Sequence, residues 1–161
     1  MPAIIYTTHA GPELGNAFAD VISGRYSPAG RLAQTWYKSE YELAPIECYN
    51  IIENDMTYLY YRGKPLYPFG YGLSYTTFTY DTPVCTAKTT VTGESVKVVT
   101  RVRNTGSVAG DEVVQLYVSH PDAPEPKPIR TLKGVKRIHL QPGEEQIVEF
   151  TLTPRNLALV D

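Results

Sequence analysis

Few residues of this 161-residue chain have the types and spacing that metal-binding or catalytic sites require. His9 and Glu13 are four residues apart, a spacing that brings two metal ligands to one face of a helix. Gly11 and Pro12 lie between them, however, and mark the start of a helix rather than its middle, so we expect no metal site. Ser74 follows a glycine by two residues, but the second glycine of a nucleophile elbow is missing.

The cysteines and carboxylates also form no recognisable site. Cys48 and Cys85 lie far apart and lack metal-binding spacing, so we expect two free thiols rather than a disulfide. Among the 17 acidic residues no pair stands out, and Glu53 and Asp55, in an irregular stretch, are interpreted as solvated surface charges. We therefore predict no catalytic residue, no metal ligand and no cofactor in this chain.

Tyrosine is the unusual residue type, with 13 copies, ten of them between Tyr37 and Tyr80. They surround residues 66–78, LYPFGYGLSYTTF, a run that suits neither a regular helix nor an uninterrupted strand. Its proline lacks an amide donor, and its two glycines allow backbone angles that other residues resist. Because the aromatic side chains can still bury a large apolar area, we interpret the run as a well-packed connector between two domains.

Composition excludes several classes of protein. Hydrophobic residues make up 42% of the chain and charged residues 20%, a balance typical of globular proteins. The net charge of −2 predicts no binding to nucleic acid or to anionic lipid. No apolar run is long enough to span a bilayer, and no signal peptide is present, although a cytoplasmic and a secreted location both stay open.

Before the connector the sequence predicts a partial α/β segment. Residues 4–7 favour a short strand, and Gly11-Pro12-Glu13 then predicts the start of a helix that ends at Gly24. Residues 31–37 are expected to be extended, and 39–62 to form a long loop in which 56–61 is a short strand. The helix has one apolar face, which needs a sheet that these residues do not supply: Leu14, Ala17, Phe18, Val21 and Ile22.

After the connector the hydrophobic period changes to two, which predicts an antiparallel β-sandwich of the immunoglobulin or fibronectin type III kind. We expect a bulge at Gly134 and a type II turn at Gln141-Pro142-Gly143. Six strands fall short of the usual seven or so, so the sandwich is expected to be incomplete at its C-terminus and to self-associate through an open edge. The expected strands are 76–80, 95–104, 111–118, 129–140, 145–152 and one that begins at 156–160.

Three blocks of sequence resemble family 3 glycoside hydrolases of the β-glucosidase and β-xylosidase type. GPELGNAFADVISGRYSPAGRLAQTWY (11–37) is similar to the last helix and strand of that family's α/β-sandwich domain. GKPLYPFGYGLSYTTF (63–78) resembles the family's interdomain signature. VRNTGSVAGDEVVQLYV (102–118) and IRTLKGVKRIHLQPGEEQIVEFTL (129–152) resemble its fibronectin type III-like domain.

The resemblance implies a division into the end of an α/β-sandwich domain (1–38), an aromatic connector (39–75) and a fibronectin type III-like β-sandwich (76–161). In that family the aspartate nucleophile lies in a barrel domain, and the glutamate acid/base lies early in the α/β-sandwich domain or its loops. Both would precede Met1, and the last strands would follow Asp161, so the chain resembles a fragment cut at both ends. Its expected partner is the remainder of such a hydrolase, through which it would serve a β-linked sugar substrate. Retaining hydrolysis needs two carboxyl groups about 5 Å apart across one sugar.

Two hypotheses for function follow. In the first, the chain is an inactive portion of a β-glycosidase and supports an active site built elsewhere. In the second, it is a standalone β-sandwich module that binds carbohydrate or protein. The unpartnered helix face favours the first. Under the first hypothesis, Tyr67, Phe69 and Tyr71 are candidates for lining or supporting the substrate pocket. We favour the alternative that these three residues join the two domains.

Overall fold

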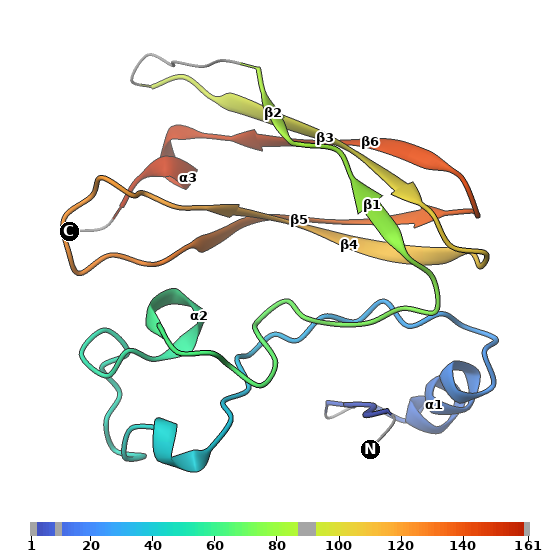
Figure 1. Cartoon of the computed structure of the whole chain (residues 1–161), viewed down its shortest axis with the longest axis horizontal. Helices are drawn as coiled ribbons and strands as arrows, with labels where there is room; N and C mark the ends of the chain where they lie inside the picture. Colours follow the sequence, from blue (N-terminus) through green and yellow to red (C-terminus); the bar gives the residue numbers. More distant parts are fainter. Residues whose placement is uncertain (1–2, 9–10, 87–92, 160–161) are drawn as a thin grey trace.

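The computed structural model describes residues 3–8, 11–86 and 93–159. Figure 1 shows strands β1–β6 stacked in the upper part of the molecule, with helices α1 and α2 and the connector beneath them. The chain is mainly β, with antiparallel strands in two sheets, as the sequence predicts. The helices are α1 (Leu14–Ile22), η1 (Glu40–Glu42), α2 (Thr57–Tyr60) and α3 (Pro154–Leu157), and the strands are β1 (Phe78–Tyr80), β2 (Val84–Cys85), β3 (Val96–Asn104), β4 (Gly110–Val118), β5 (Thr131–Leu140) and β6 (Glu145–Leu152).

Strand β3 is the centre of the first sheet. On one side it pairs with β1 and β2 in succession, and on the other with β6. Alternate residues of β3 are buried, including Val98 and Val102, because successive side chains of a strand point to opposite faces. The two-residue strand β2 was not predicted, since Val84 and Cys85 lie between a proline and polar residues and show no alternation.

Strands β4 and β5 form the second sheet as an antiparallel hairpin. The register shifts where Leu116 pairs with Gly134 but Tyr117 pairs with Leu132, so Lys133 is the extra residue and the predicted bulge is confirmed. A Cβ atom on Gly134 would lie 2.5 Å from the ring of Phe150, which explains why glycine occupies this position. The turn to β6 is also confirmed, with Gly143 at φ +77° and the Glu144 amide donating to the Gln141 carbonyl over 3.0 Å.

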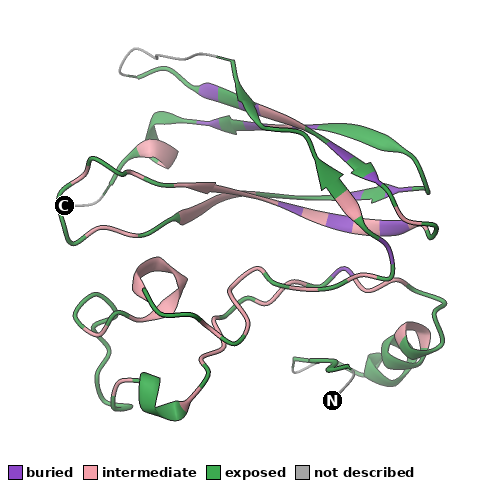
Figure 2. Cartoon of the chain, viewed as in Figure 1, coloured by how far each residue is buried: buried purple, intermediate pink, exposed green. Residues whose placement is uncertain are grey.

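The core lies between the two sheets. Figure 2 shows buried residues mainly as short bands along the strands, whereas the segments below are half-buried or exposed except at Ala29 and Thr76. Burying one such aliphatic or aromatic side chain stabilises the fold by about 1.5–3 kcal/mol. The core residues come from four strands of both sheets: Val102, Val114, Ile138, Leu140, Val148 and Phe150.

Helix α1 forms where the apolar period predicts it, and Gly24 follows it at φ +75°. The helix begins at Leu14 rather than at Pro12 and has no side-chain cap. None of its residues is buried, and Phe18 and Ile22 are 41% and 59% exposed. The described residues therefore leave the apolar face of α1 exposed.

Three predicted strands are wrong. Residues 4–7 are irregular and exposed, and 56–61 contain the helical turn α2 instead of a strand. The strand expected at 156–160 is replaced over its described part by α3, because Pro154 suits the first turn of a helix and Thr153 and Asn156 form a capping box. At 56–61 and 156–160 a short apolar or β-branched run fits both a strand and a helical turn, and hydrogen bonds outside the hydrophobic pattern decide between them.

Cys48 and Cys85 are both exposed free thiols, as expected. Within the described ranges, no helix has the length and apolar character needed to cross a membrane.

Candidate functional site

The connector forms an irregular antiparallel ribbon with the residues that follow α1. The amide of Trp36 donates to the carbonyl of Tyr67 over 2.9 Å, and the amide of Leu32 donates to the carbonyl of Tyr71 over 2.8 Å. Residues 31–37 are therefore extended, as predicted, although only Trp36 and Tyr67 form a regular bridge. This ribbon lies below strand β4 in Figure 1.

The three candidate aromatic residues pack mainly against other rings. Tyr67 stacks on Tyr71 with ring centroids 5.3 Å apart, and its edge contacts Trp36. Phe69 stacks on Tyr58 at 4.1 Å, and Tyr58 in turn contacts Tyr117 of β4 at 6.1 Å. Tyr67 and Phe69 are half-buried, whereas Tyr71 is 38% exposed.

Gly70 brings the connector into close contact with β4. Its φ is +80°, and an added Cβ would lie closer than 3.0 Å to the Gln115 side-chain oxygen and to the Tyr117 hydroxyl. The Gln115 amide nitrogen donates to the Gly70 carbonyl over 3.1 Å. The position therefore needs glycine both for its backbone angle and for the lack of a side chain.

A buried ion pair joins the segment after α1 to the sandwich. The guanidinium of Arg31 donates to Glu112 of β4 over 2.6 Å, and the two side chains are only 13% and 10% exposed. The hydroxyl of Tyr80 on β1 donates to the other Glu112 oxygen, also over 2.6 Å. Burial and this hydrogen bond raise the pKa of Tyr80, so its hydroxyl stays neutral and holds the carboxylate.

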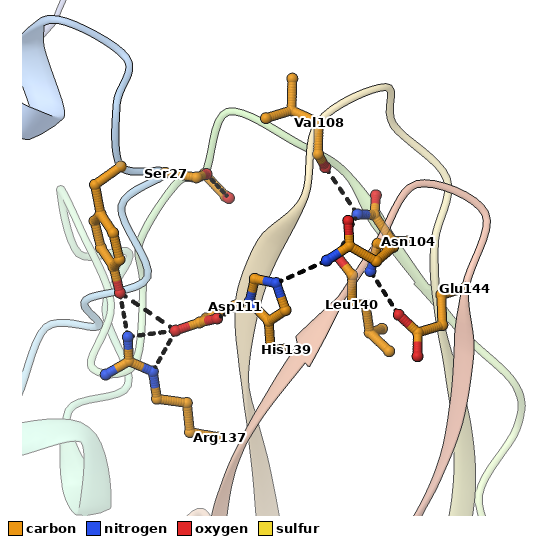
Figure 3. Close-up of polar contacts among 11 residues, drawn as sticks. Ser27, Asn104, Val108, Asp111, Arg137, His139, Leu140 and Glu144 are labelled. Atoms are coloured by element: carbon orange, nitrogen blue, oxygen red, sulfur yellow. Dashed lines mark hydrogen bonds and ion pairs between the residues drawn. The ribbon is translucent and has the colours of Figure 1, made fainter.

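A second polar cluster lies on the outer side of the same hairpin. Figure 3 shows Asp111 between Arg137 and His139. Its carboxylate accepts hydrogen bonds from Arg137 and Tyr26 and is 2.5 Å from His139 Nδ1. Burial raises the pKa of Asp111, but the hydrogen bonds from His139, Arg137 and Tyr26 outweigh it and hold the pKa below its usual value. Since Tyr26 follows α1, this cluster also fixes that segment to the sandwich.

This cluster predicts a loss of stability in acid. The charged Asp111 stabilises the folded state fully above pH 3.8, its ordinary pKa, and this contribution disappears as the pH falls through the lower pKa of the folded state. Asp111→Asn should therefore lower the melting temperature at neutral pH and flatten its decline toward about pH 3. Melting curves by circular dichroism across this range measure both effects. The matched control is Asp20→Asn, because Asp20 forms an exposed pair with Arg25. Equal pH profiles for the two variants would contradict the assignment.

Asn104 fixes the connector end of the sandwich from within. Its side chain is fully buried, donates to the carbonyls of Val108 and Leu140, and accepts from the Thr76 hydroxyl over 2.6 Å. Figure 3 shows Asn104 between Val108 and Leu140. Because all these partners are protein groups, we interpret Asn104 as structural.

Sequence reasoning did not single out Arg31, Glu112 or Asp111. A signal for Glu112 was present, because it lies two residues before Val114 on the inward face of a predicted strand. A carboxylate at an inward position implies a buried cationic partner. The sequence offers no comparable signal for which of its 15 basic residues that partner is.

The described residues bring together no catalytic arrangement. Glu112 is the one buried carboxylate among them, and it is neutralised by Arg31. No group of three or more His, Cys, Asp or Glu side chains that could hold a metal ion occurs in this part of the chain. The sequence predicts that His9 and Glu13 form no metal site. His9 lies outside the described residues, so the structure does not test this prediction. What the geometry does provide is a set of polar and aromatic contacts that hold two segments together.

Two family models match the chain. Residues 1–75 match the glycosyl hydrolase family 3 C-terminal domain, and residues 112–161 match a fibronectin type III-like domain. Among curated proteins, the chain is 37% identical to β-glucosidase BoGH3A of Bacteroides ovatus over 177 aligned residues, which cover 100% of the chain and 24% of that protein. It is 38% identical to a β-xylosidase of Formosa agariphila, covering 94% of the chain and 21% of the relative.

The same relationship is found among solved structures. The chain superposes on β-glucosidase 3B from Thermotoga neapolitana, in complex with glucose, with a TM-score of 0.80 and 34% identity over 92% of its length. It also superposes on a β-D-glucoside glucohydrolase from Trichoderma reesei with a TM-score of 0.77 and 32% identity over 90% of its length. It covers 22% and 24% of these two structures, and so spans about a quarter of the length of the relatives it matches.

Proposed function

Because the chain belongs to the C-terminal region of glycosyl hydrolase family 3, we propose that it is the non-catalytic C-terminal portion of a retaining β-glycosidase. In this role it supports an active site that other parts of the enzyme supply, and it stabilises the whole protein. The observation that carries the proposal is α1, an amphipathic helix of which no residue is buried. A standalone module would leave this apolar face in water, whereas a larger α/β domain would cover it.

We further propose that the chain divides into residues 1–38, 39–75 and 76–161, which are the end of an α/β domain, the connector and the sandwich. Supporting this division, the first regular strand of the sandwich, β1, begins at Phe78. The contacts of Arg31, Tyr26 and Gly70 with β4 and β5 then act as the joint between the domains. Through these contacts the folded sandwich holds the preceding loops in a fixed position.

Tyr67, Phe69 and Tyr71 are proposed as supporting residues for the substrate pocket rather than as its lining. Their rings pack on one another and on Tyr58 and Trp36, which supports a positioning role. The substrate class would be a β-glucoside or a β-xyloside, as the names of the relatives suggest.

The proposal predicts that the chain alone does not hydrolyse aryl β-glucosides or aryl β-xylosides. In a chimera, the residues of T. neapolitana β-glucosidase 3B that superpose on the chain are replaced by it. We expect this chimera to be active and folded, whereas the same enzyme with that region deleted should be inactive or aggregated. Release of the aryl group and a thermal melt measure the two properties. Turnover by the isolated chain that is lost when its own carboxylates are substituted would overturn the proposal.

A further inference from the structure

The joint between connector and sandwich forms an open cavity of about 290 Å³ at the surface, which we call the seam cavity. On the connector side it is lined by Pro68–Tyr71, and on the strand side by Glu112, Gln115, Tyr117 and Arg130. Small-molecule sites in proteins have volumes from about 300 Å³ upward. A second cavity of about 480 Å³ shares Arg31, Phe69, Gly70, Val113 and Gln115 with it, so the two adjoin.

The lining of the seam cavity carries one positive charge that is not neutralised. Arg31 and Glu112 form the buried ion pair described above, and their charges cancel. Arg130, the other arginine of the lining, lies over the Tyr117 ring at 4.9 Å from its centroid and makes no hydrogen bond to a described residue. Its guanidinium, which offers a fork of donors that fits a carboxylate, is therefore available to a ligand.

The other groups of the cavity suit a polyhydroxylated molecule. Phe69, Tyr71 and Tyr117 supply aromatic rings. One face of each ring is covered, by Tyr58, Tyr67 and Arg130 respectively, which leaves the opposite face for the C–H face of a pyranose. Glu112, Gln115 and the hydroxyls of Tyr80 and Tyr117 supply hydrogen-bonding groups beside them. Burial raises the pKa of Tyr117 as well as that of Tyr80, so both hydroxyls stay neutral. Since they donate to Gln115 and Glu112, each offers its oxygen to a ligand as an acceptor.

We propose that the seam cavity binds a small polyhydroxylated ligand that carries a single carboxylate, with a hexuronic acid as its representative. The carboxylate lies against Arg130, and the sugar ring packs on the aromatic lining between connector and β4. The inference does not depend on the proposed function. A free uronic acid and a uronic acid at the end of a glycan share this chemistry, and the adjoining cavity has room for a second sugar unit.

Titration of the full chain tests the proposal, with glucuronate, glucose and acetate as probes. Isothermal calorimetry measures affinity, and amide NMR spectra locate binding through the signals of Gly70, Val113 and Gln115, which line the cavity. We expect glucuronate to bind about tenfold or more tightly than either glucose or acetate, because only glucuronate satisfies both the guanidinium and the ring faces. A uronate-terminated disaccharide that binds more tightly still identifies the glycan end as the ligand, and equal affinity identifies the free acid.

Arg130→Gln should weaken glucuronate binding about tenfold or more and leave glucose unchanged, because it removes one charge-assisted hydrogen-bonding partner. Arg130 is exposed, so the variant is expected to fold, and Arg130→Lys should retain part of the affinity. Arg155→Gln, on α3 and outside the cavity lining, is the matched control. The proposal is overturned if glucuronate binds no better than glucose, if acetate binds equally well, or if Arg130→Gln and Arg155→Gln behave alike.

Discussion

Arg31→Met is expected to lower the free energy of unfolding by about 3–5 kcal/mol, because it leaves the buried charge of Glu112 without its cation. Glu112 is 8% exposed, and the Tyr80 hydroxyl alone cannot neutralise it. The substitution also removes the hydrogen bonds from Arg31 to the carbonyls of Ala29 and Gly30. Urea unfolding followed by circular dichroism and by the fluorescence of Trp36, the single tryptophan, reports on the sandwich and on the joint separately.

Two further variants test whether the loss of stability comes from the buried ion pair. Arg25→Met removes an ion pair with Asp20 whose side chains are 68% and 44% exposed, and such a pair contributes at most about 1 kcal/mol. The double variant Arg31→Met/Glu112→Met replaces the buried pair by apolar side chains and should regain most of the lost stability. If Arg31→Met costs no more than Arg25→Met, the ion pair does not hold the joint.

Gly70→Ala is the second substitution with a large expected effect, about 2–4 kcal/mol of destabilisation. Alanine is strained at a φ of +80°, and its Cβ would overlap the side chains of Gln115 and Tyr117. Both effects push the connector away from β4 and break the hydrogen bond from Gln115 to the Gly70 carbonyl. Thermal and urea unfolding measure the loss, and Trp36 fluorescence should change at lower urea than the β-sheet signal.

The matched control is Gly143→Ala. Gly143 has a similar φ of +77°, but no heavy atom lies within 4 Å of an added Cβ. This variant should therefore show only the cost of the backbone angle, about 1 kcal/mol. The difference between the two variants isolates the close approach of connector and strand. Equal losses would mean that the space at Gly70 plays no part.

The sandwich could be predicted from the sequence because its signal is repeated along each strand. Val98, Val102, Val148 and Phe150 alternate with polar residues, and the structure buries all four. The bulge at Gly134 and the turn at Gly143 could be predicted for a related reason, since each requires a residue type that few other structures require. Local chemistry and long-range packing agree at these positions.

The wrong secondary-structure predictions concern short runs in which local propensity and long-range packing do not agree. MTYLYY, residues 56–61, has strong strand propensity, yet Thr57 takes a φ of +63° and the segment forms one helical turn. There the Tyr37 hydroxyl accepts the hydrogen bond of the Thr57 amide, a contact across 20 residues that no local pattern contains. Propensity is a weak guide when tertiary contacts decide the outcome.

The candidate site was predicted only in outline. The composition of the run around Tyr67, Phe69 and Tyr71 predicts an irregular, aromatic-rich segment, but it does not predict the partners of these residues. The pairings of Arg31 with Glu112 and of Tyr26 with Arg137 join residues 81 and 111 positions apart. Such contacts depend on how two folded segments meet, and a single sequence carries no periodic signal for them.

The strand pairings also set the order in which this region is expected to form during synthesis. Strands β4 and β5 are neighbours in sequence and can pair as a hairpin as soon as residue 140 has left the ribosome, whereas the pairing of β3 with β6 must wait until β6 has been made. Local pairings close faster than distant ones because less chain entropy is lost. The contacts of Arg31, Tyr26 and Gly70 are all made to this early hairpin. The joint can therefore assemble before β6 pairs with β3 and closes the sandwich.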